Sequence, residues 1–126
     1  MKTHKAYKID AYRNIVTEVA IGDYRDIYKQ IECGTFTVAS YLPNGDTLYV
    51  DDEGYLNEKV TRGFMFNGRF FAGNGLLLGA TKGGDSANVK TKSLDAANMV
   101  TFAPEGFVIT DKIRQDAMSG FSVTML

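Results

Sequence analysis

The feature that most constrains the fold of this chain is the turn sequence Pro43-Asn44-Gly45-Asp46. It separates two runs rich in β-branched and aromatic residues, residues 35–42 and 47–50. Asn-Gly tolerates the positive φ angles of a tight β-turn, so the pattern predicts a β-hairpin. Across this hairpin we expect Tyr41 and Tyr49 to form a cross-strand pair.

Two more hairpins are predicted on either side of this one. Residues 6–10 and 15–21 alternate apolar and polar side chains in places around Arg13-Asn14, and residues 63–66 and 69–72 flank Asn67-Gly68. Residues 75–80 add another strand, in which glycines are typical of a bulge or of close backbone approach. The paired glycines in residues 82–86 indicate a mobile surface loop.

The main helix is predicted over residues 24–32. Tyr24, Ile27, Tyr28 and Ile31 recur at spacings of three and four, which places them on one helical face. Asp23 can accept hydrogen bonds from the first turn, and we expect Gly34 to adopt the left-handed conformation that closes the helix.

The C-terminal part predicts shorter elements. Ser93 is the expected cap of a short helix over residues 94–98, and residues 100–102 return to the sheet. A second helix is expected over residues 111–118, with Asp111 as its cap and Gly120 as its stop. The resulting fold class is α+β, in a single domain of residues 1–126. It has a mainly antiparallel sheet built from hairpins, one main helix (about 23–33), and one or two short C-terminal helices.

Charge and composition exclude several classes of function. The chain has fourteen Lys and Arg residues and fifteen Asp and Glu residues, so it lacks the basic surplus typical of nucleic-acid binders. No apolar run is long enough to cross a bilayer, so we expect a cytoplasmic protein. His4 is the only histidine and Cys33 the only cysteine, which excludes a histidine-based triad or a multi-cysteine zinc site within one chain.

Three short motifs have both a functional and a structural interpretation. Asp51-Asp52-Glu53 could hold a hard cation, but it lacks the ligand order of a calcium loop and fits turn chemistry better. Residues 73–79 are glycine-rich but lack the Gly-Lys-Ser/Thr of a phosphate-binding loop. Residues 62–66 match the start of an RNA-recognition signature for only a few positions. We therefore expect no catalytic residues, no metal and no cofactor, and a binding protein rather than an enzyme.

Two kinds of binding stay open. A protein interface could form from exposed sheet edges or apolar side chains, including one between copies of this chain. Alternatively, an oligomer could build a pocket for a nucleotide-like ligand, with aromatic rings stacking on the base and basic residues meeting the phosphates. The candidate ligand-binding residues are Arg62, Phe64, Phe66, Arg69 and Lys82. Convergence of the basic residues in a pocket would favour the ligand, and scattering would favour the protein partner.

A set of turns and strand ends also carries a family resemblance. The matching features are Glu32-Cys33-Gly34, the strand of residues 36–42, Asn44-Gly45-Asp46, residues 49–54, and residues 71–75 leading to Leu76-Leu77-Leu78. In these features residues 31–79 resemble the domain of unknown function 3846, an uncharacterised domain of bacteriophages and mobile elements. Residues 104–126 look like an extension outside the shared pattern.

The resemblance implies a phage accessory gene whose product works in the cytoplasm of a bacterial host. Such genes often encode small proteins that bind a host component, so a role in host takeover or counter-defence is expected. The alternatives are a protein that sequesters a nucleotide-like small molecule and a small virion or structural component.

Overall fold

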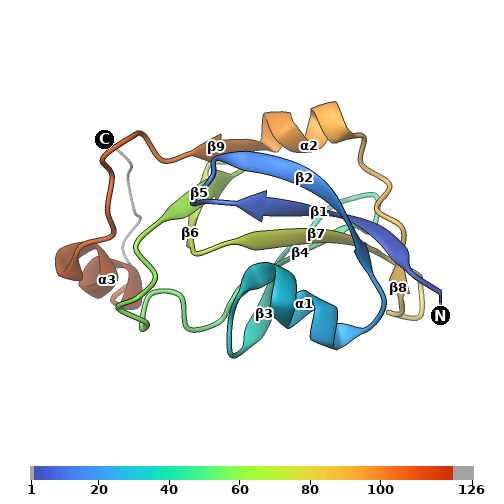
Figure 1. Cartoon of the computed structure of the whole chain (residues 1–126), viewed down its shortest axis with the longest axis horizontal. Helices are drawn as coiled ribbons and strands as arrows, with labels where there is room; N and C mark the ends of the chain where they lie inside the picture. The colour runs from blue at the N-terminus through green and yellow to red at the C-terminus, as the bar shows by residue number, and fades with distance from the viewer. Residues whose placement is uncertain (1, 121–126) are drawn as a thin grey trace.

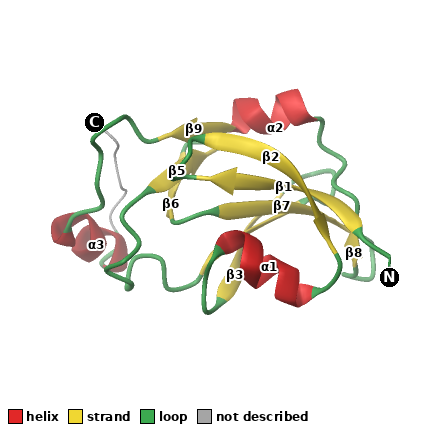
Figure 2. Ribbon diagram, viewed as in Figure 1, coloured by secondary structure: helices red, strands yellow, loops and turns green. Residues whose placement is uncertain are grey.

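The computed structural model describes residues 2–120 and shows the expected α+β class (Figures 1 and 2). Its elements, in chain order, are β1 (His4–Asp10), β2 (Ile15–Ile21), α1 (Tyr24–Ile31), β3 (Phe36–Tyr41), β4 (Thr47–Asp51), β5 (Gly63–Phe66), β6 (Arg69–Ala72), β7 (Gly75–Ala80), β8 (Ser86–Ala87), α2 (Ser93–Met99), β9 (Val100–Phe102) and α3 (Asp111–Met118). All three predicted hairpins and the predicted strand of residues 75–80 are confirmed.

The strands form two sheets in which every pairing is antiparallel. The larger sheet has the order β2-β1-β7-β4-β3, with β8 also pairing with β7, and the smaller sheet has the order β6-β5-β9. In Figure 1, α1 and α2 lie on opposite sides of the strands, and α3 lies at the end of the molecule far from the N-terminus. Strand β7 is therefore central although it comes late in the chain.

The central position of β7 explains its unbroken apolar run. Leu76 and Leu78 pack with Ile27 and Ile31 of α1 on one face of the larger sheet. Leu77 packs on the other face, in a cluster that includes aromatic residues of the smaller sheet. Because successive side chains of a strand point to opposite faces, a strand buried on both faces needs apolar residues at consecutive positions.

Glycine lets β7 approach the smaller sheet closely. A Cβ atom placed on Gly75 would lie 2.6 Å from Cζ of Phe64, a ring that is fully buried. The predicted close backbone approach is found at Gly79, where a Cβ atom would clash with the backbone carbonyl of Asn88, whereas Gly75 makes room for a side chain.

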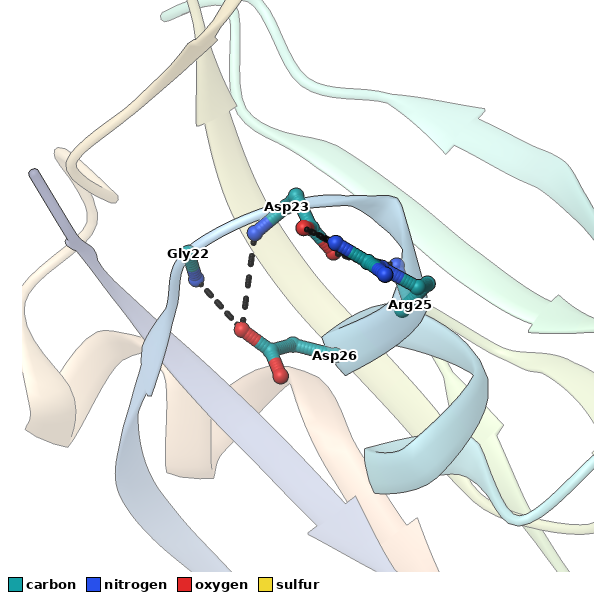
Figure 3. Close-up of polar contacts among 4 residues, drawn as sticks. All are labelled: Gly22, Asp23, Arg25 and Asp26. Atoms are coloured by element: carbon teal, nitrogen blue, oxygen red, sulfur yellow. Dashed lines mark hydrogen bonds and ion pairs between the residues drawn. The ribbon is translucent and has the colours of Figure 1, made fainter. Parts of the chain in front are cut away.

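The start of α1 is set by reciprocal hydrogen bonds between side chains and backbone (Figure 3). The Asp23 carboxylate accepts from the Arg25 amide at 2.9 Å, and the Asp26 carboxylate accepts from the Gly22 amide at 2.6 Å. These bonds satisfy amides that have no partner within the helix. The Arg25 guanidinium also donates to Asp23, and these contacts hold the pKa of the Asp23 carboxyl below its usual value.

The other predicted caps are partly wrong. Glu32, with φ of 61°, takes the left-handed position that ends α1, and Gly34 does not. Lys92 precedes α2, so Ser93 is its first helical residue rather than its cap. Thr110 rather than Asp111 caps α3, through a hydrogen bond from the Ile113 amide to its hydroxyl.

A second correction concerns the register of the β3–β4 hairpin. Tyr41 lies opposite Thr47, and Val38 lies opposite Tyr49, so the two tyrosines are not direct partners. The register shifts between Val38 and Ser40 because of a bulge in β3. An inserted residue of this kind cannot be read from side-chain alternation alone.

Residues 103–120 dock on the rest of the domain through two arginines. The Arg62 guanidinium donates to the backbone carbonyls of Ala103, Pro104 and Phe107, at 2.7 to 3.0 Å. Arg114 of α3 is 7% exposed. It donates to a second set of carbonyls, those of Gly54, Tyr55, Asn57, Glu58 and Val60. The described part of the predicted C-terminal extension is therefore built into the domain.

None of the helices within residues 2–120 has both the length and the apolar character needed to cross a membrane.

Candidate functional site

A polar cleft of about 510 Å³ opens at the end of the larger sheet where β1 finishes. Its volume lies within the range of known small-molecule sites. The lining residues come from five separate segments of the chain. They are Lys8, Asp10, Tyr12, Arg13, Ile31, Glu32, Asp51, Asn57, Lys59, Val60, Gly73 and Asn74.

The floor of the cleft is fixed by Asn74, which is 2% exposed. Its Oδ1 accepts from the Ala11 amide at 2.9 Å, and its Nδ2 donates to Oε2 of Glu32 at 3.0 Å. Glu32 reaches this position from the left-handed end of α1, a backbone conformation that disfavours a residue with a side chain. Such a conformation persists only where the surrounding contacts impose it.

The wall formed by the β1–β2 turn is equally well defined. Asp10 is 6% exposed, and its Oδ1 accepts from the amides of Tyr12 and Arg13 at 3.0 and 3.1 Å. The Tyr12 hydroxyl accepts from the Thr61 amide at 3.2 Å, which ties this turn to the opposite side of the cleft. The Tyr12 ring is still about half exposed and forms part of the rim.

The opposite wall is the loop of residues 54–60, and Arg114 holds it. The loop contributes Asn57, Lys59 and Val60 to the lining. Arg114 donates to the carbonyls of Asn57 and Val60, and the Asn57 side chain accepts from the Lys59 amide. Five carbonyls that converge on one guanidinium define a loop that has no strand pairing of its own.

Three cations and three carboxylates face the cleft: Lys8, Arg13 and Lys59, and Asp10, Glu32 and Asp51. Lys8 is the most enclosed of the cations, with 18% of its side chain exposed, and its Nζ lies 3.7 Å from Glu32. Within residues 2–120 Glu32 is the ion-pair partner of this ammonium, at a distance longer than a hydrogen bond. Burial raises the pKa of the Asp51 carboxyl, and no described cation lies within ion-pair distance of it.

Cys33 lies next to this site but has little nucleophilic character. Burial, with a further contribution from the Asp51 charge, raises the pKa of its thiol to about 11. The reactive form of a cysteine is the thiolate, so a pKa this high leaves the group protonated at neutral pH. Cys33 is thus best described as a small, partly buried side chain.

A second feature is a row of aromatic rings across α1, β3 and β4, which we call the aromatic row: Tyr24, Tyr28, Phe36 and Tyr49. Tyr24 is exposed at one end, and the other three rings are partly buried. Successive ring centroids lie 6.2, 4.8 and 5.5 Å apart, each pair edge to face. Tyr24 is 63% exposed. Tyr41, which is 74% exposed, lies near Tyr49 and helps to raise the pKa of its phenol, which burial raises most.

The five predicted ligand-binding residues are not brought together. Phe64 and Phe66 are 0% and 2% exposed, so their rings belong to the core and are closed to a ligand. Arg62 is engaged by backbone carbonyls. Arg69 lies over the Phe71 ring at 5.2 Å, and Lys82 is exposed in a turn.

By the criterion stated for the two kinds of binding, this scattering favours a protein partner over a nucleotide at these residues. The polar cleft was not predicted because its lining residues come from segments that lie far apart in the chain. The strongest available hint was Asn74 between two glycines, a polar residue inside an otherwise buried stretch.

Among residues 2–120, no group of three or more His, Cys, Asp or Glu side chains is placed to hold a metal ion. Comparison of the chain with models of protein families, with curated proteins and with solved structures found no match.

Proposed function

We propose that this chain is a non-catalytic binding protein that occupies the surface of a protein partner through the aromatic row and Tyr41. One observation carries the proposal: the row of rings ends in solvent at Tyr24, and Tyr41 is exposed on the neighbouring edge strand. Tyrosine gives a large contact area at low cost in side-chain entropy, and it is enriched at protein interfaces.

Side chains, rather than backbone, carry the proposed contact. Strand β3 is at the edge of the larger sheet, and residues 36–41 contain no charged side chain. An edge of this kind invites strand addition, but the bulge between Val38 and Ser40 interrupts its hydrogen-bonding groups. The exposed rings beside the edge are therefore the better docking surface.

Charge next to the row indicates the chemistry of the partner. Phe36 pairs with Asp51, and the exposed residues Asp52 and Glu53 follow directly. We expect a partner surface with apolar side chains flanked by Lys or Arg, because complementary charges raise association rates and exclude other partners. The resemblance to a phage and mobile-element domain supplies the setting, a protein of the bacterial host cytoplasm.

The test is site-specific photo-crosslinking in bacterial cells, with a photoreactive amino acid at position 41 or, as a control, at position 94. Leu94 is 71% exposed on α2, on the other side of the strands. A polypeptide that crosslinks through position 41 but not through position 94 is then purified. Titration calorimetry measures its affinity for the wild-type chain, for the double variant Tyr24→Ala/Tyr41→Ala and for Leu94→Ala.

The double variant should lose at least about tenfold in affinity, and Leu94→Ala should bind like the wild type. Equal binding by all three proteins would refute the proposed surface. If the joined polypeptide is a second copy of this chain, the partner is the chain itself, and the row is a homo-oligomer interface rather than a host-binding surface.

A further inference from the structure

Besides the aromatic row, the polar cleft has the construction of a ligand site. It is bounded by Asn74, Asp10 and the Arg114-bound loop, whose polar groups are held by hydrogen bonds to the backbone. A site that is fixed before the ligand arrives loses less entropy on binding. The question is therefore which chemistry the fixed groups fit.

The charges in the cleft are balanced and only partly paired. Lys8 and Glu32 approach no closer than 3.7 Å, and Arg13 and Asp10 no closer than 4.0 Å, both beyond hydrogen-bond distance. One Asp51 oxygen accepts from the Glu53 amide at 2.9 Å, which leaves the other without a described donor. The cleft thus holds an ammonium whose ion-pair partner lies beyond hydrogen-bond distance, and a partly buried carboxylate with one oxygen that has no described donor.

A ligand that satisfies both groups must carry both charges. We propose that the cleft binds a small zwitterion, an α-amino acid or short peptide, with its carboxylate at Lys8 and its ammonium at Asp51. A nucleotide fits less well because its phosphate charge would enter a lining with equal numbers of cations and carboxylates. Arg13 and Lys59 then stand at the rim, where exposed charges contribute less.

Tyr12 completes the site. Its hydroxyl accepts from the Thr61 amide, and its half-exposed side chain lines the cleft. An aromatic face at this position can cover the ligand side chain or attract its ammonium. We therefore expect amino acids with large apolar or aromatic side chains to bind more tightly than glycine.

The experiment begins with two-dimensional NMR of the labelled full chain, with each of the twenty amino acids added singly and with adenosine monophosphate as the anionic comparison. The tightest-binding amino acid is then compared by calorimetry with its N-acetyl derivative, which lacks the ammonium, and with its carboxamide, which lacks the carboxylate. Each derivative should bind at least about tenfold more weakly than the parent, since each loses one charge-assisted contact.

Two substitutions assign the charges. Lys8→Met should weaken binding of the parent amino acid about tenfold and leave the carboxamide unaffected, because the carboxamide has no carboxylate to lose. Asp51→Asn should also weaken binding of the parent amino acid about tenfold. It should leave binding of the N-acetyl derivative unaffected, because that derivative has no ammonium to contact Asp51. Lys82→Met, in an exposed turn away from the cleft, is the control for loss of a cation.

The inference is overturned if no amino acid, added up to about 10 mM, gives chemical-shift changes that approach saturation, because any dissociation constant would then be too weak for a specific site. It is also overturned if adenosine monophosphate binds more tightly than every amino acid, or if Asp51→Asn leaves the affinity unchanged. None of these outcomes bears on Tyr24 and Tyr41, so the proposed protein partner stands or falls separately.

Discussion

The larger sheet and the walls of the polar cleft are stabilised in different ways. Strands β1, β7 and β4 are joined by continuous backbone ladders, with apolar side chains packed on both faces. Residues 54–62 and 103–107 lie outside these ladders, and many of their carbonyls bind the guanidinium groups of Arg62 and Arg114. The first region shares its stability among many similar contacts. The second has a small apolar cluster that includes Val60, but it concentrates its polar contacts on two side chains, so single substitutions should affect the two regions differently.

The largest effect is expected for Arg114→Met. The methionine keeps most of the apolar stem, but it removes every hydrogen bond to the carbonyls of the loop, which leaves buried acceptors unpaired. Hydrogen bonds to charged groups contribute about 1.5–3 kcal/mol each, so we expect the free energy of unfolding to fall by at least about 3 kcal/mol. Urea unfolding measures it.

Lys112→Met is the matched control for this substitution, because Lys112 is an exposed residue of the same helix. It should change the free energy of unfolding by no more than about 0.5 kcal/mol. If both variants unfold at the same urea concentration, the guanidinium does not hold the loop in solution and the contrast between the two regions fails.

A smaller effect is expected for Asp46→Asn at the opposite end of the larger sheet. The fully buried Asp46 carboxylate accepts from the amides of Lys90 and Thr91 and from the Thr91 hydroxyl, at 2.6 to 3.1 Å. An asparagine presents an N–H group to some of these donors. We expect a loss of about 2 kcal/mol in calorimetric unfolding.

Asp85→Asn changes the same chemical group at an exposed position and should unfold like the wild type. Equal stability of the Asp46 and Asp85 variants would mean that backbone pairing between strands is enough to hold this end of the sheet. The difference between the sheet and the arginine-bound walls of the cleft would then be larger than we infer.

The third prediction concerns the end of α1. Replacing Glu32 loses its contacts with Asn74 and Lys8, but glycine also relieves the left-handed backbone, whereas alanine does not. Glu32→Gly should therefore be more stable than Glu32→Ala by about 1 kcal/mol. Thermal unfolding of the pair decides this, and an equally stable alanine variant would show that this backbone conformation is not kept in solution.

The smallest expected effect is a pH-dependent gain in stability for Asp51→Asn. Burial raises the pKa of Asp51 in the folded protein above its ordinary value of 3.8, so the charged carboxylate opposes folding at neutral pH. The variant should be slightly more stable than the wild type at pH 7. The difference should shrink as the pH falls through the folded-state pKa, because the wild-type carboxyl then also becomes neutral.

Asp52→Asn is the control, because it removes a charge from the exposed neighbouring position. It separates the effect of losing a charge from the effect of removing a charge that is partly buried. A wild-type protein that is more stable than Asp51→Asn at pH 7 would contradict the prediction. Binding sites commonly give up stability for function, and a stabilising substitution here would fit that pattern.

Local chemistry predicted much of the larger sheet and of α1. Asn-Gly turns, alternating strands and the Asp23 cap depend on residues that are near each other in the sequence, so their rules apply before the chain folds. The cap at Glu32 was missed because its side chain bonds to Asn74, far along the chain. The bulge in β3 was missed because it is a property of strand pairing.

The candidate site was less predictable than the fold. Arg62 has the residue type of a phosphate ligand, yet its donors are used by backbone carbonyls that only the folded chain brings within reach. Phe64 and Phe66 have the residue type of a stacking platform, yet both strand faces at that position are covered. Residue type indicates what a side chain can bind, whereas burial decides whether a ligand can reach it.

The position of Arg114 couples the C-terminal helix to the cleft. Its guanidinium belongs to α3, but the carbonyls it binds belong to the loop that carries Asn57 and Lys59. If the loop takes its cleft-forming shape only while α3 is docked, any ligand of the cleft must tighten the docking of α3 by the same factor by which docking tightens the ligand. A factor that displaced the helix would then release the contents of the cleft without touching its lining.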